Sequence, residues 1–75
     1  MYEESLTQDG HTRTFRIREG QPTGWEVVEE HDRRVVQARC YSDWHRVERA
    51  RRAWQLEVQL LRDAGWSADE PAVEI

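Results

Sequence analysis

The chain has 75 residues, which is the length of one small domain with a modest core. Its 15 acidic and 11 basic residues give a formal net charge of −4, and an acidic balance does not favour binding to nucleic acids or membranes. One cysteine excludes an intramolecular disulfide, and no apolar run exceeds two residues, which excludes a transmembrane helix. We therefore expect a single α+β domain over residues 1–66, followed by a frayed tail over residues 67–75.

The basic residues are all arginine, a bias typical of GC-rich bacterial genomes. The acidic N-terminus has no apolar segment of the kind found in signal peptides. The free thiol of Cys40 fits a reducing compartment. We expect a small cytoplasmic bacterial protein.

Residues 2–41 predict an antiparallel meander of three or four strands. Polar and apolar residues alternate most clearly over residues 12–19, where Phe15 and Ile17 share one face. Asp9-Gly10 is a strong hairpin signal, and residues 20–24 have the composition of a loop. The expected strands cover residues 12–19, 25–30 and 34–41, with a turn at residues 31–33. Residues 2–8 are the additional strand of the four-stranded alternative.

In the last expected strand, Val36, Ala38 and Cys40 share one face. We expect this face to lie under a helix, because small side chains there leave room for Trp44 and Trp54. Cys40 is then interpreted as a buried small hydrophobic residue rather than as a reactive thiol.

A long amphipathic helix is predicted over residues 43–64. Ser42 is the expected N-cap, Gly65 suits the left-handed position after the C-terminus, and Trp66 then folds back over the last turn. A period of 3.6 residues places the core-facing residues on one stripe. They are Trp44, Val47, Ala50, Trp54, Val58 and Leu61.

More of this helix is apolar than a single sheet can cover. Ala53, Leu56, Leu60 and Ala64 widen the apolar arc to about 200°, whereas a helix on one sheet needs roughly 100–140°. A second copy of the chain is the simplest cover for so small a protein, with Arg49 at the rim. We therefore expect a homodimer or a protein-interaction module; the alternative is that the chain's own ends cover these residues.

Single-stranded nucleic-acid binding is the alternative function. Arg16, Arg18, Arg39 and Tyr41 are expected on one exposed sheet face, where cations and an aromatic ring can bind phosphates and bases. With four strands the element order ββββα resembles the unit of the Pur and Whirly families of single-stranded nucleic-acid-binding proteins. The resemblance is one of element order, and no motif residue is carried over.

No catalytic, metal or cofactor site is expected, so the protein is not predicted to be an enzyme. Ser42, Asp43 and His45 are the residue types of a catalytic triad. At the start of a helix, however, the N-cap role explains Ser42 and the favourable interaction with the helix dipole explains Asp43. The spacing of the possible metal ligands matches no zinc pattern. Those ligands are His11, His31, Cys40 and His45.

Overall fold

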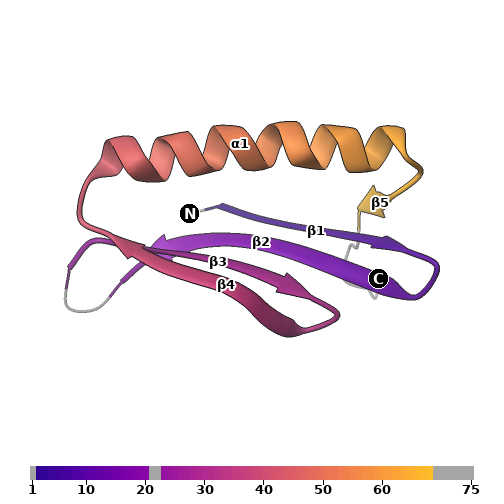
Figure 1. Ribbon diagram of the computed structural model, residues 1–75, viewed down its shortest axis with the longest axis horizontal. Coiled ribbons are helices and arrows are strands. Elements are labelled where there is room, and N and C mark those ends of the chain that lie inside the picture. Colours follow the sequence, from indigo (N-terminus) through magenta and orange to yellow (C-terminus); the bar gives the residue numbers. More distant parts are fainter. Residues whose placement is uncertain (1, 21–22, 69–75) are drawn as a thin grey trace, which may run out of the picture.

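The computed structural model describes residues 2–20 and 23–68. They form an antiparallel sheet with the strand order β4-β3-β2-β1-β5 and one helix along one side of it (Figure 1). The expected α+β meander followed by a helix is confirmed, and residues 2–8 are a strand. The elements are β1 (Tyr2–Gln8), β2 (His11–Glu19), β3 (Trp25–His31), β4 (Arg34–Tyr41), α1 (Trp44–Asp63) and β5 (Ser67–Ala68).

The first two residues of the expected frayed tail belong to the sheet. Ser67 and Ala68 pair with Thr7 and Leu6 of β1 and so extend the sheet by one short strand. The remainder of the expected tail, residues 69–75, lies outside the described residues.

Two hairpin turns confirm the positions expected from the sequence. Asp9 and Gly10 have φ angles of 52° and 82°, as in the type I′ turn that matches strand twist. Asp32 and Arg33 form a turn of the same kind, with φ angles of 53° and 68°, although neither is glycine. The carboxylate of Asp32 accepts the backbone N–H of Thr12 at 2.9 Å, and this bond holds the second turn against β2.

The core lies between α1 and the facing side of β1, β2 and β3. The ring centroid of Trp54 lies 5.3 Å from that of Phe15 and 6.4 Å from that of Tyr2. Burying each large side chain contributes roughly 1.5–3 kcal/mol, so a few such residues account for most of the hydrophobic stabilisation. The core cluster is Leu6, Phe15, Ile17, Val27, Val47, Trp54 and Val58.

The start of α1 differs from the prediction. Asp43, not Ser42, is the N-cap, and its carboxylate accepts the N–H of His45 at 2.9 Å. Aspartate and serine cap equally well, so composition alone could not choose between them. Trp44 is 41% exposed, contrary to its expected place in the core, because α1 begins with it. Its ring packs against that of Trp25, with a centroid distance of 5.0 Å.

The end of α1 is the one predicted. Gly65 has a φ of 104°, and the N–H of Trp66 donates to the carbonyl of Leu61 at 2.9 Å. The N–H of Gly65 donates to the carbonyl of Arg62 at 3.0 Å. These two bonds define a Schellman motif, which turns the chain back toward β1. Trp66 consequently packs against the core.

From Gln37 onward, the faces of β4 are the reverse of the prediction. Arg39 pairs with Val27 of the core, so Arg39 faces α1, and Cys40 is exposed on the opposite face of the sheet. The cause is a one-residue bulge opposite Glu29 and Glu30, which shifts the register of β4 at Val36. Without that extra residue the strand would present Val36 to the helix, as expected from simple alternation.

Candidate interaction surface

An apolar ridge runs along the exposed side of α1. The side chains of Leu56 and Leu60 are 68% and 62% exposed, and Ala53 and Ala64 of the same stripe are also exposed. No described residue covers these side chains, so the ends of the described chain do not serve as their cover. We call Ala53, Leu56, Leu60 and Ala64 the apolar ridge.

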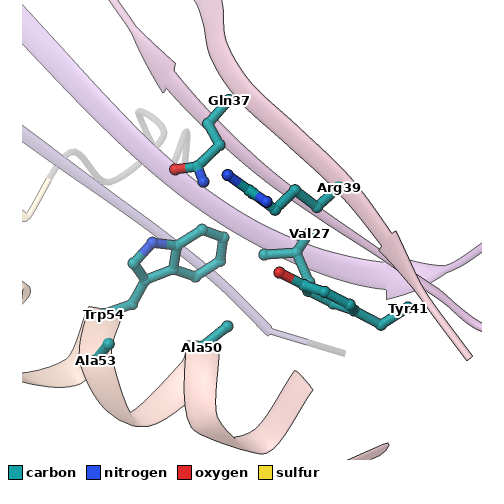
Figure 2. Close-up of a pocket in the computed structure, with 7 residues that line it drawn as sticks. All are labelled: Val27, Gln37, Arg39, Tyr41, Ala50, Ala53 and Trp54. Carbon is teal, nitrogen blue, oxygen red and sulfur yellow. The ribbon is translucent and has the colours of Figure 1, made fainter. Parts of the chain in front are cut away.

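A groove separates α1 from β4. Figure 2 shows Gln37, Arg39 and Tyr41 extending from β4 toward the helix, where Ala50 and Trp54 line the opposite side of the groove. The cavity between them has a volume of about 200 Å³. Its lining combines an apolar floor with polar and cationic groups of β4, an arrangement typical of binding grooves. The residues are Val27, Gln37, Arg39, Tyr41, Ala50, Ala53 and Trp54.

The groove opens toward the first half of α1 into a basic cleft. Arg39 of β4 and Arg46 and Arg49 of α1 line this cleft together with Tyr41 and the small side chains of α1. Within residues 2–20 and 23–68, none of these three guanidinium groups forms an ion pair. We call the cavity and this cleft together the α1–β4 groove.

Charge is strongly segregated along the chain. Residues 33–52 contain seven arginines and two carboxylates, a formal charge of +5, whereas the rest of the chain carries −9, which gives −4 in total. In the described part of the chain, five arginines pair with carboxylates: Arg13, Arg16, Arg18, Arg51 and Arg62. Six do not, and all six lie within residues 33–52. The net charge of the whole chain does not reveal this basic segment. Counting charges over successive short stretches of the sequence would have found it.

The residues predicted to bind nucleic acid do not form one surface. Arg16 hydrogen-bonds Glu30, and Arg18 donates to the carboxylate of Glu26 at 2.7 Å, both on the sheet face opposite α1. Arg39 and Tyr41 lie on the other face, in the α1–β4 groove. The expectation of a shared face was wrong because the bulge in β4 reverses that strand.

Of the remaining polar candidates, Asp43 has a structural role and Cys40 lies at the surface. Asp43 caps α1 through the N–H of His45, and Cys40 is exposed, contrary to its expected burial. In the described ranges, no group of three or more His, Cys, Asp or Glu side chains is placed to hold a metal ion.

At the side of α1 nearest β1, the hydrogen bond from Arg51 lowers the pKa of Glu48 below its ordinary value. Arg62 donates to Glu4 at 2.6 Å and joins α1 to β1.

Comparison with known proteins gives no relative. A scan against protein-family models found no match, and searches of curated proteins and of solved structures found none either. Within the described residues, the one helix is too polar to cross a membrane.

Proposed function

We propose that this protein is a non-catalytic interaction module that forms a homodimer through the apolar ridge of α1. The observation that carries the proposal is the exposure of Leu56 and Leu60, two large apolar side chains one turn apart on a helix whose other side is already packed. A helix of 20 residues is about 30 Å long, long enough to supply the core of a two-helix interface.

Charge supports an antiparallel pairing of two α1 helices across a twofold axis. Such a pairing centred on Leu56 and Leu60 places Arg49 and Arg52 of one copy near Asp63 of the other, so the basic half of each helix faces the acidic end of its partner. A parallel pairing would bring the basic halves together. Arg49 lies one helical turn before Ala53, at the rim of the ridge.

Light scattering behind a size-exclusion column tests the proposal. Over a range of concentrations we expect a mass of about twice 9.0 kDa. Leu56→Glu and Leu60→Glu should each give the monomer mass, because a carboxylate buried in an apolar interface loses its hydration. Gln55→Glu is the matched control, since it adds the same charge at an exposed helix position away from the ridge and should leave the dimer intact. A wild-type monomer at all concentrations, or dimers in both leucine variants, would refute the proposal.

A further inference from the structure

β4 is an edge strand with its outer side open. It stands at one end of the strand order, with β3 as its neighbour, and residues 34–40 are all exposed. An edge strand presents backbone N–H and C=O groups that no neighbouring strand satisfies, and an extended peptide can pair with them. The strand edge itself lies away from the apolar ridge of α1, although the adjoining α1–β4 groove shares Ala53 with that ridge.

Only part of this edge is suited to pairing. The bulge opposite Glu29 and Glu30 distorts the first half of β4, and bulges commonly prevent edge-to-edge association. Residues 37–41 follow the bulge and pair in regular register with residues 25–29 of β3. A peptide could therefore extend the sheet along about five residues of the edge.

The two faces of this segment differ in chemistry. On the helix side, Gln37, Arg39 and Tyr41 open into the α1–β4 groove with its two further cations, Arg46 and Arg49. On the opposite face lie the small side chains of Ala38 and Cys40. A strand added beside β4 would place alternate side chains on these two faces. On the groove side, the arginines favour carboxylate side chains of a bound peptide. On the opposite face, Ala38 and Cys40 favour apolar side chains.

We infer that the α1–β4 groove and the adjacent β4 edge bind an extended peptide in which acidic and apolar residues alternate. The carboxylates lie beside Arg39, Arg46 and Arg49, and the apolar side chains lie beside Ala38 and Cys40. Carboxylate recognition by guanidinium groups is directional and strong, which gives the site its preference for acidic sequences.

The same surface is less suited to a single-stranded nucleic acid. Glu26 and Glu30 lie on the sheet face that carries Ala38 and Cys40, and Glu26 pairs directly with Cys40. Arg18 and Arg16 already pair with these carboxylates, so their guanidinium groups are engaged and not open to phosphates. Nucleic-acid phosphates also cannot donate hydrogen bonds to the open carbonyl groups of β4, whereas peptide N–H groups can.

Fluorescence anisotropy with labelled eight-residue peptides tests the inference. The probes are a peptide of alternating Glu and Val, the same composition with four Glu followed by four Val, and an alternating Gln and Val peptide. We expect the alternating acidic peptide to bind about tenfold more tightly than either control, since only it matches both faces. Equal binding of the two acidic peptides would overturn the inference, because charge without alternation would then suffice. Equal binding of the Gln peptide would also overturn it, because the cations would then have no role.

Charge-neutralising variants locate the site. Replacing Arg39, Arg46 and Arg49 by Gln should weaken binding of the alternating acidic peptide about tenfold. The matched control replaces Arg33, Arg34 and Arg52 by Gln, which removes the same charge outside the groove and should preserve binding. Circular dichroism of both variants verifies folding. An equal loss in the two triple variants would show attraction to the whole basic segment and refute the site.

Two further measurements separate this inference from its competitors. Leu56→Glu should bind the acidic peptide as the wild type does, so that loss of the dimer and loss of peptide binding are distinguishable. A 15-nucleotide oligo-dT is the competing ligand. If it binds more tightly than the alternating peptide, and does so through Arg39, Arg46 and Arg49, the groove is a nucleic-acid site and the peptide inference is wrong.

Discussion

A Cβ atom placed on Gly24 would lie 2.6 Å from the carbonyl oxygen of Tyr41. Gly24 precedes β3 and has a φ of 88°, and Tyr41 is the last residue of β4 before the chain turns into α1. This close backbone approach fixes where the chain leaves the sheet.

Gly24→Ala should be strongly destabilising. The substitution adds the steric cost of a left-handed alanine, about 1–2 kcal/mol, to a backbone contact that cannot relax by side-chain rotation. We expect a loss of more than about 2 kcal/mol in urea unfolding. Gly10→Ala is the control, because Gly10 has a similar φ of 82° but nothing within 4 Å of its added Cβ. Equal losses at the two positions would show that the contact with Tyr41 is unimportant.

Arg33→Gly should stabilise the protein. Arg33 holds a φ of 68° in the type I′ turn, where a side chain costs about 1–2 kcal/mol and glycine costs little. Part of this gain is offset by the greater freedom of glycine in the unfolded chain, so we expect a net increase of up to about 1 kcal/mol. Thermal and urea unfolding measure it. Arg34→Gly, inside β4, should instead destabilise, and a similar change in both variants would argue against turn strain.

Asp32 should contribute to stability at neutral pH and lose that contribution in acid. The N–H of Thr12, followed by the ring of His11, lowers the pKa of the Asp32 carboxyl below its ordinary value of 3.8. A group with a lowered folded-state pKa stabilises the fold fully above its unfolded pKa and progressively less as the pH falls through the folded value. Asp32→Asn keeps the turn geometry but removes the charge. Urea unfolding should separate variant from wild type at pH 7, and the curves should converge as the pH falls well below 3.8, the ordinary pKa of the carboxyl. A difference independent of pH would exclude the ionic contribution.

Tyr2→Phe should leave the protein at least as stable. The hydroxyl of Tyr2 is buried without a hydrogen-bond partner among the described residues, and burial, followed by the charge of Glu4, raises its pKa above 10.0. Removing an unsatisfied buried hydroxyl should raise the free energy of unfolding by about 1 kcal/mol. Because the raised pKa favours the folded state only while the phenol stays protonated, wild-type stability should fall as pH rises above about 10, whereas that of Tyr2→Phe should fall less. A variant clearly less stable than the wild type would mean that the hydroxyl has a partner.

The helix and the first four strands could be predicted from the sequence. Which face of β4 points toward α1 could not. The type I′ turn and the end of α1 both need a left-handed backbone, which few residues adopt readily. Because Asp9-Gly10 and Gly65 are suited to it, the first hairpin and the end of α1 were predictable. The bulge at Val36 has no such signature. It arises from the fit of β4 to β3, and a single extra residue exchanged the faces of Arg39 and Cys40.

The candidate site was predictable only in part. Leu56 and Leu60 follow from helical period alone, because their angular position is fixed relative to Val47, Trp54 and Val58. The α1–β4 groove depends on the inverted face of β4. The alternation of polar and apolar residues in the sequence could not have predicted this groove.

The meander order of the sheet also has a kinetic consequence. Every pairing among β1, β2, β3 and β4 joins strands that are consecutive in the chain, two of them through two-residue turns. Local pairings close short loops, so they form at little entropic cost and we expect folding within milliseconds. The pairing of Leu6 with Ala68 is different, since it joins the two ends of the described chain. β5 should therefore be the last element to form and the first to open in hydrogen exchange.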